Sequence, residues 1–144
     1  MEYINIFQAA RKSKGYTQEK LAELTGVSVG TIKAYESDKT IPKDPEIVRR
    51  LVNILDAQHL YAELANKNPL NQEVIPKIST NQPLLKVAMR TVKDLKEIEP
   101  EVDQFFFITS KGEIDAGEQK DYDNFVKKLE NILSCCLDLK FAKK

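Results

Sequence analysis

The chain carries few residues suited to catalytic or metal chemistry. Its one histidine, His59, and its adjacent cysteines, Cys135 and Cys136, cannot supply the four ligands of a zinc site at the usual spacing. A disulfide between neighbouring cysteines would be strained and would close no useful loop, so we expect free, buried thiols. No nucleophile and base can be paired from these residues. We therefore expect no metal, no cofactor and no enzymatic activity.

The pattern best suited to chemistry is a set of hydrogen-bonding residues between Thr17 and Glu36, read as TQEKLAELTGVSVGTIKAYE. Thr17 and Ser28 are good N-caps, each directly before a helix-forming segment. Gly26 between the segments allows a left-handed turn, and Ala22 is small where two helices would cross. A capped helix, a glycine turn and a second capped helix make a helix-turn-helix, whose second helix enters the major groove of DNA.

The elements that must position these residues are short amphipathic helices. Gly15 and Gly26 are predicted to end helices, and Asp44 followed by Pro45 is predicted to begin one. The spacing of apolar residues predicts five helices in the first 65 residues. Their approximate ranges are 5–14, 18–25, 28–36, 45–55 and 58–65.

The rest of the chain predicts a linker and a helical hairpin. Residues 66–83 hold three prolines and four asparagines, which is typical of a surface linker. Apolar residues at three- and four-residue spacing predict a helix over 84–98, and a second stripe runs from Tyr122 to Leu137. With a turn at 111–113 between them, these helices form an antiparallel hairpin covering residues 84–144.

Residues 1–65 resemble the Cro/C1-type helix-turn-helix family of phage repressors and bacterial regulators, also called the XRE family. The residues that carry the resemblance are Arg11, Gly15, Thr17, Gln18, Leu21, Ala22, Leu24, Gly26, Val27, Ser28, Ile32, Glu36, Ile41, Pro42, Ile47, Leu51 and Leu55. The resemblance implies an all-α fold, with a five-helix, lambda-repressor-like DNA-binding bundle followed by the C-terminal helical hairpin. Residues 84–140 also resemble, more weakly, helical tails of such regulators in Gram-positive bacteria and their mobile elements.

The resemblance also implies a DNA-contacting role for particular residues. Contacts to the phosphate backbone are expected from Thr17, Gln18, Lys39, Thr40 and Lys43. Base reading is expected from Ser28, Val29, Gly30, Thr31, Lys33 and Ala34. Arg11 and Glu36 correspond to a structural pair that joins the first helix to the end of the third, with little direct role on DNA.

The recognition helix departs from the family at Val29, Gly30 and Ala34, where relatives often carry Gln, Arg or Asn. Two interpretations remain open. In the first, Val29 and Ala34 contact thymine methyl groups while Thr31 and Lys33 make the polar contacts. In the second, base specificity is weak and the protein reads DNA shape, or the domain has drifted toward binding protein.

A single small DNA-binding domain such as residues 1–65, which we call the reader, covers half of an operator. A homodimer on a palindromic site is therefore expected. The stripe of the last helix is the candidate interface, through Phe125, Leu129, Ile132, Leu133 and Cys136. The alternative is that this apolar stripe packs entirely within the hairpin of its own chain. A regulatory protein partner could also occupy the C-terminal helices.

Composition is consistent with a cytoplasmic regulator. The sequence has 22 Lys and Arg residues against 22 Asp and Glu residues. This balance excludes a strongly basic protein that coats DNA. No apolar stretch approaches the roughly 18 residues of a membrane span, and the N-terminus has no secretion signal. The sequence therefore predicts a double-stranded DNA-binding transcriptional regulator, by family habit a repressor of phage or mobile-element type. The alternative is a protein-interaction module, an antitoxin or adaptor, built on the same bundle.

Overall fold

The structure, a computed structural model, describes residues 5–144 and divides the chain into two compact units, one ending at Lys67 and the other running from Asn68 to Lys144. Met1 to Ile4, part of the N-terminus searched for a secretion signal, lie outside the described residues. The described residues are all-α: they contain helices and a single isolated bridge, but no strand.

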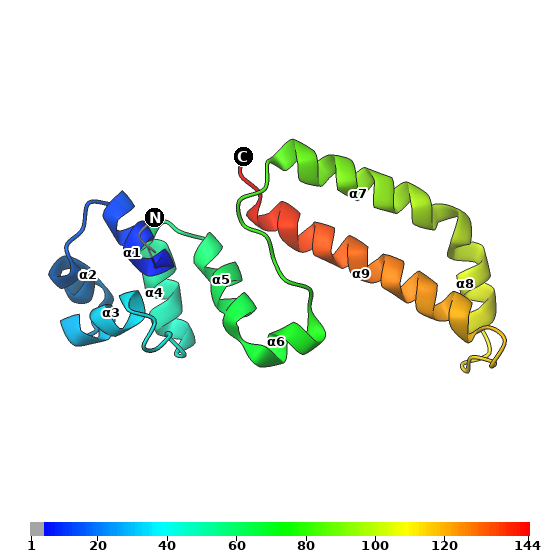
Figure 1. Cartoon of the computed structure of the whole chain (residues 1–144), viewed down its shortest axis with the longest axis horizontal. Helices are drawn as coiled ribbons and strands as arrows, with labels where there is room; N and C mark the ends of the chain where they lie inside the picture. The colour runs from blue at the N-terminus through cyan, green and yellow to red at the C-terminus, as the bar shows by residue number, and fades with distance from the viewer. Residues whose placement is uncertain (1–4) are drawn as a thin grey trace. The chain divides into compact units, whose positions relative to one another are not determined.

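The N-terminal unit is a bundle of five short helices (Figure 1). They are α1 (Ile6–Ser13), α2 (Gln18–Thr25), α3 (Val29–Glu36), α4 (Pro45–Leu55) and α5 (His59–Lys67). Four of the five begin at a side-chain cap, at Asn5, Thr17, Ser28 and Asp44. Because each cap satisfies backbone N–H groups that the helix itself leaves unpaired, these starting points are fixed locally by sequence.

One apolar core holds the five helices together. Phe7 of α1 packs against Tyr35 of α3, with ring centroids 5.8 Å apart. Leu21 and Ile32 close the space between α2 and α3. The buried members of this core are Phe7, Ala10, Leu21, Ala22, Ile32, Tyr35, Leu51, Val52, Leu55, Ala57 and Leu60. The five-helix bundle predicted from the sequence is confirmed.

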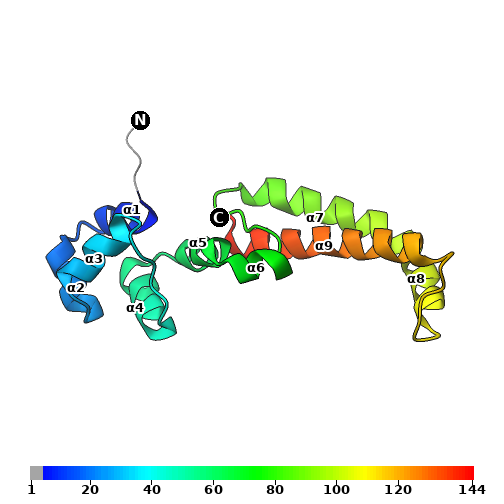
Figure 2. The ribbon, with the colours of Figure 1, turned by 60° about the horizontal axis from the view of Figure 1, so that its bottom comes forward.

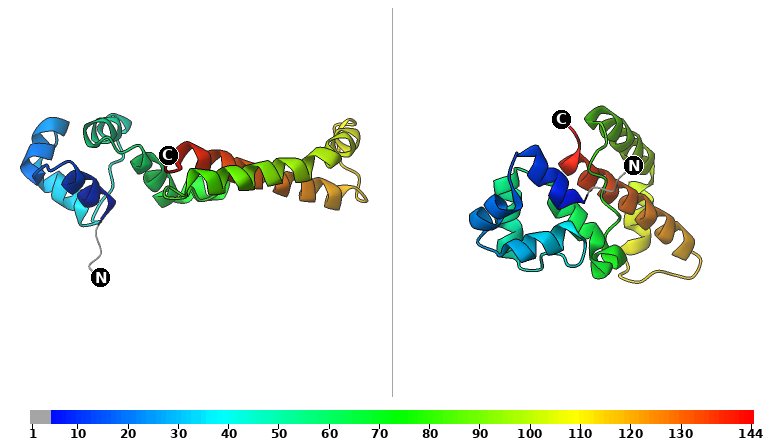
Figure 3. Two further views of the ribbon diagram at one scale, coloured as in Figure 1. Left: turned by 90° about the horizontal axis from the view of Figure 1, so that it is seen from above. Right: turned by 60° about the vertical axis from the view of Figure 1, so that its left-hand side comes forward.

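The C-terminal unit is an antiparallel helical hairpin. Its helices are α6 (Pro69–Val74), α7 (Leu84–Ile98), α8 (Val102–Thr109) and α9 (Gln119–Phe141), with a 3-10 turn at Glu99–Glu101. Figures 1 and 2 show α7 and α9 side by side along their length, with α8 turning across the far end. The left view of Figure 3 shows the same pairing from above.

The short helix α6 lies in the stretch 66–83, where the composition predicts a surface linker. Asn68 accepts a hydrogen bond from the backbone N–H of Leu70 at 3.0 Å, and Pro69 occupies the first helical turn. Asparagine as a cap and proline directly after it are a helix-start signal, the same one that Asp44 and Pro45 provide. Proline and asparagine content alone therefore does not indicate this short helix.

The open end of the hairpin is tied together by a buried polar cluster. Asp138 of α9 accepts hydrogen bonds from Arg90 Nη2 at 2.6 Å and from the backbone N–H of Ser79 at 2.8 Å. The buried thiol of Cys135 lies between Arg90, whose Nε donates to it at 3.2 Å, and Asp94, to which it donates at 3.3 Å. At the opposite end, Phe105 of α8 stacks on Phe125 of α9 with centroids 4.0 Å apart.

None of the helices in the described part of the chain is both long and apolar enough to cross a membrane.

Candidate nucleic-acid interface

Helices α2 and α3 and the turn between them form the candidate interface. Gly26 ends α2 at a φ of 75°, in the left-handed region that glycine adopts without strain, and its N–H donates to Ala22 O at 2.9 Å. The Thr25 hydroxyl is fully buried and donates to Leu21 O at 2.7 Å. Both hydrogen bonds close the C-terminal end of α2, and the left-handed backbone at Gly26 then turns the chain toward α3.

The start of α3 presents small polar residues to solvent. Ser28 Oγ caps the helix by accepting from the Thr31 N–H at 3.0 Å, and the two hydroxyl groups lie 2.9 Å apart. Ser28, Gly30 and Lys33 are exposed, whereas Thr31 and Ala34 are half-buried. Val29 is half-buried as well and packs against the core of the bundle. Of the six residues expected to read bases, three are thus open to a ligand and three are partly covered.

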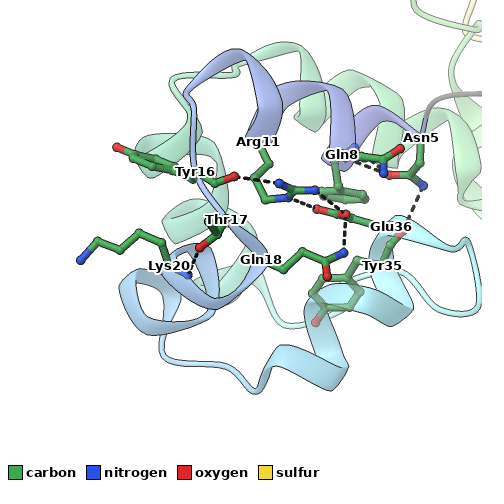
Figure 4. Close-up of polar contacts among 10 residues, drawn as sticks. Asn5, Gln8, Arg11, Tyr16, Thr17, Gln18, Lys20, Tyr35 and Glu36 are labelled. Carbon is green, nitrogen blue, oxygen red and sulfur yellow. Dashed lines mark hydrogen bonds and ion pairs between the residues drawn. The ribbon is translucent and has the colours of Figure 1, made fainter.

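The start of α2 holds the expected phosphate contacts Thr17 and Gln18 (Figure 4). Thr17 Oγ1 accepts from the backbone N–H of Lys20 at 3.0 Å, which is its capping role. Gln18 is half-buried, and its Nε2 donates to Glu36 Oε2 at 2.9 Å. An amide nitrogen has two hydrogens, so Gln18 keeps one donor for a phosphate oxygen. Its link to Glu36 fixes the side chain before DNA arrives.

Arg11 of α1 and Glu36 at the end of α3 form a bidentate ion pair. Arg11 Nε and Nη2 donate to the two carboxylate oxygens at 2.5 and 3.1 Å, and Nη1 donates to Tyr16 O at 2.7 Å. Burial tends to raise the pKa of Glu36, but the hydrogen bonds from Arg11 and Gln18 outweigh it and hold that pKa below its ordinary value. The hydrogen bond to Glu36 raises the pKa of Arg11, against the smaller effect of burial. The pair therefore joins the ends of three helices as a charged, desolvated unit.

Asn5 is a structural residue that the sequence reasoning missed. Its Oδ1 caps α1 by accepting from the Phe7 N–H at 2.8 Å, while its Nδ2 donates to Tyr35 O at 3.0 Å and to Asp38 Oδ1 at 2.7 Å. It is buried, with 2% of its surface exposed. The cap could have been found from an asparagine directly before an apolar segment. No local pattern gives the bonds to the end of α3.

The loop after α3 brings further cations to the same part of the bundle. Lys39, Thr40 and Lys43 are all exposed and lie between α3 and α4, with Pro42 buried as the anchor of the loop. Among the described residues, Lys33, Lys39 and Lys43 form no ion pair. Lys20, by contrast, is paired with Glu23 at 3.1 Å. The free positive charge of this unit is therefore concentrated on α3 and the loop that follows it.

Comparison with known proteins agrees with this geometry. Residues 7–59 match the family model described as Helix-turn-helix, which supports a Cro/C1-type, or XRE, helix-turn-helix domain in the N-terminal unit. The match supports a DNA-binding transcriptional regulator with double-stranded DNA as its ligand. Neither the curated proteins nor the solved structures gave a match to this chain.

Proposed function

We propose that this regulator is a sequence-specific repressor that binds a palindromic operator as a homodimer. The observation that carries the proposal is the rigid α2–α3 pair, whose second helix begins with exposed Ser28, Gly30 and Lys33. A helix start with small residues can approach base edges closely, and one flexible lysine there can reach a guanine. Repression needs only occupancy of the operator, which a reader and a dimerisation element suffice to achieve.

In this proposal, one set of residues contacts the DNA backbone and another set contacts the bases. Thr17, Gln18, Lys39, Thr40 and Lys43 flank α3 and hold the phosphate backbone, which sets the register of the reader on the duplex. The base-reading set is Ser28, Val29, Gly30, Thr31, Lys33 and Ala34. Since Val29 packs toward the core, its methyl groups would reach thymine only through their exposed edge. Lys33 is the one long side chain of the set, so most of the hydrogen-bonded discrimination depends on it.

A source in phages or mobile elements is supported by the resemblance of residues 1–65 to phage repressors. Arg11, Gln18 and Glu36, which are among the residues that carry this resemblance, form one hydrogen-bonded group in the bundle. This arrangement is expected if the three residues stabilise the same fold here as in the phage repressors. The proposal of a dimer rests on the reach of the reader, because one unit of this size covers a single half-site.

A selection of bound fragments from random duplexes, followed by binding measured as fluorescence anisotropy, tests the proposal. We expect an enriched palindrome with half-sites about one helical turn apart. Lys43→Ala should weaken binding to all duplexes equally and reduce the dependence on salt, whereas Lys33→Ala should change the base preference. Lys120→Ala, an exposed lysine of the C-terminal unit, is the matched control.

The sparse hydrogen-bonding groups on α3 favour a second candidate, in which the bundle is an antitoxin or adaptor that binds protein. Only Lys33 among the six predicted base-reading residues has a long polar side chain. In that case the selection yields no enriched sequence, and Lys33→Ala and Lys43→Ala have equal, small effects on duplex binding. An enriched palindrome rejects this candidate.

A further inference from the structure

The hairpin of the C-terminal unit leaves a large apolar surface exposed. Thirteen large apolar side chains are exposed among the described residues, and all but Leu24 lie in this unit. Six of them form what we call the hairpin face: Leu85, Met89, Val92 and Leu95 on α7, and Leu129 and Leu133 on α9. Leu85 and Met89 are the most open, with 72% and 65% of their surface exposed.

These residues lie on one side of the hairpin because of helix geometry. On α7, Val92 and Leu95 directly follow Thr91 and Asp94, which turn toward the hairpin interior. On α9, Leu133 directly follows the half-buried Ile132 in the same way. One residue further along a helix turns the side chain by about 100° in a fixed sense. Since α7 and α9 run antiparallel, the same sense of rotation carries Val92, Leu95 and Leu133 to the same side. Met89 follows the buried Val87 by two residues, so it lies further round, at the outer edge of this face.

The exposure of these side chains changes the set of residues expected at a dimer interface. Phe125 is buried inside the hairpin, where it stacks on Phe105, and Ile132 is half-buried. Leu129, Leu133 and Cys136 remain exposed. The larger part of the exposed apolar surface at this expected interface comes from α7.

The dimensions of the hairpin face fit a second copy of the same chain. Helix α7 has 15 residues, and at about 1.5 Å per residue it is about 22 Å long, while two adjacent helices are about 20 Å wide. The flat projection is therefore about 440 Å², and the relief of the side chains makes the accessible area larger. The flat projection alone is about half of the roughly 800 Å² that each partner buries in a standard interface, and the relief of the side chains reduces this difference. Two such hairpins, each open on one side, close into a four-helix bundle.

The charges at the rim select one arrangement of the two copies. Lys93, Lys96 and Glu97 border the apolar groove of α7, and Lys93 pairs with Glu97 at 3.7 Å, which leaves Lys96 as the lysine of this border that pairs with no described residue. On α9, Glu130 follows Leu129. Arg90 lies opposite Asp138, and Glu101 lies opposite Lys128, which places Lys96 within one helical turn of the height of Glu130. A two-fold axis along the helices brings α7 against α9 of the second copy, so that Lys96 meets Glu130. An axis across the helices would instead place α7 against α7 of the second copy, so that Lys96 and Glu130 would not meet.

We propose that the hairpin face is the homodimer interface, and that two copies form a four-helix bundle about a two-fold axis parallel to α7 and α9. This inference rests on the proposed homodimer and names its contact surface. It brings both chains into the bundle at the same end, at Leu84, as two readers on one operator require. Each copy contributes the same surface, so the contact closes on itself and makes no fibre.

The first test compares two leucines of the same unit in the full chain. Leu85→Lys on the hairpin face should convert the dimer to a monomer in light scattering at micromolar concentration, since it places a charge inside the apolar contact. Leu70→Lys on α6 is the matched control, because Leu70 is 76% exposed and lies outside the hairpin face. Circular dichroism should show unchanged helix content for both. A monomeric wild type, or a dimeric Leu85→Lys with control-like behaviour, overturns the proposal.

The second test is a charge-reversal cycle for the arrangement. Lys96→Glu and Glu130→Lys should each raise the dimer dissociation constant roughly three- to tenfold at low salt, and the double variant should return it close to wild type. Additive losses in the double variant overturn the parallel-axis arrangement. These measurements are made without DNA. If the dimer shows the expected effects of these substitutions but the selection enriches no duplex sequence, this inference stands and the proposed repressor function is refuted.

Discussion

Replacing Glu36 with glutamine tests whether the buried ion pair holds the reader together. The change removes the negative charge that accepts two hydrogen bonds from Arg11 and one from Gln18. The Arg11 side chain, which is only 10% exposed, then keeps its bond to Tyr16 O but loses its counter-charge. Removing one partner of a buried pair costs about 3–5 kcal/mol. Since Arg11 keeps one good acceptor, we expect a loss at the lower end, about 3 kcal/mol.

The assay must report on the N-terminal unit within the full chain. Pulse-labelling hydrogen exchange in urea, read by mass spectrometry of peptides, follows the two units separately. A loss of about 3 kcal/mol corresponds to a fall in the melting temperature of the N-terminal unit by about 12–24 °C. The peptides of the C-terminal unit should unfold at the same urea concentration as in the wild type.

Glu46→Gln is the matched control for this prediction. Glu46 also interacts with two arginines, since it accepts a hydrogen bond from Arg49 at 2.7 Å and forms an ion pair with Arg50 at 3.4 Å, but its side chain is 52% exposed. Exposed pairs contribute about 0–1 kcal/mol, so the control should unfold close to the wild type. Equal losses in Glu36→Gln and Glu46→Gln would refute the reasoning, because burial would then not decide the strength of the pair.

The pH dependence gives a second readout of the same residue. Despite the opposing effect of burial, hydrogen bonds from Arg11 and Gln18 hold the pKa of Glu36 below its ordinary value of 4.5. A carboxylate with a lowered pKa stabilises the fold above its unfolded value and loses that contribution as the pH falls through its folded value. The difference in free energy of unfolding between wild type and Glu36→Gln should therefore be constant near pH 7 and shrink below about pH 4.5. A pH-independent difference would contradict this.

Three further perturbations test other parts of the chain. Gly26→Ala should destabilise the reader by about 1–2 kcal/mol in urea unfolding, because alanine must adopt a left-handed backbone and its Cβ would lie 3.4 Å from Arg50 Nη1. Gly15→Ala, with a similar φ but nothing within 4 Å, should cost no more. Asn5→Ala should cost about 2–3 kcal/mol, since it removes a cap and leaves the Tyr35 carbonyl with only the long hydrogen bond from the Asp38 N–H at 3.4 Å; a loss below about 1 kcal/mol would contradict the role assigned to its cross-links. Asp138→Ala should speed amide exchange in residues 75–83 while leaving the N-terminal unit unchanged, and unaltered exchange there would show that this carboxylate does not anchor the segment.

The reader helices could be predicted because their signals are local. Thr17, Ser28 and Asp44 are caps within a few residues of the helices they begin, and Gly26 stands where the backbone requires a positive φ. The family model over residues 7–59 confirms the type of domain that these signals indicate. At Asn68 and Pro69 a local helix-start signal is also present, but the composition of the segment predicted a linker there. A short helix forms at this signal.

Contacts between distant residues could not be derived in the same way. Asn5 meets Tyr35 thirty residues later, and Ser79 meets Asp138 across fifty-nine. Helical periodicity gave the apolar stripes of α7 and α9 but not which part of each stripe faces the other helix. That division depends on how the two helices are rotated in the hairpin, and it moves Phe125 from the expected interface into the interior.

The zero net charge of the chain takes on a different meaning once ion pairs are placed. Residues 1–43 hold seven Lys or Arg against five Asp or Glu, an excess of +2. Arg11, Lys14 and Lys20 are paired with carboxylates. Of the four other cations, three lie on α3 or the loop after it, and none of these three pairs with a described residue. Few phosphate contacts per reader mean weak binding by one copy, because affinity for DNA grows with each charge neutralised. If two readers are joined by the hairpin face, as we propose, the second contact becomes intramolecular, and we expect the affinity for an operator to depend on the strength of the dimer.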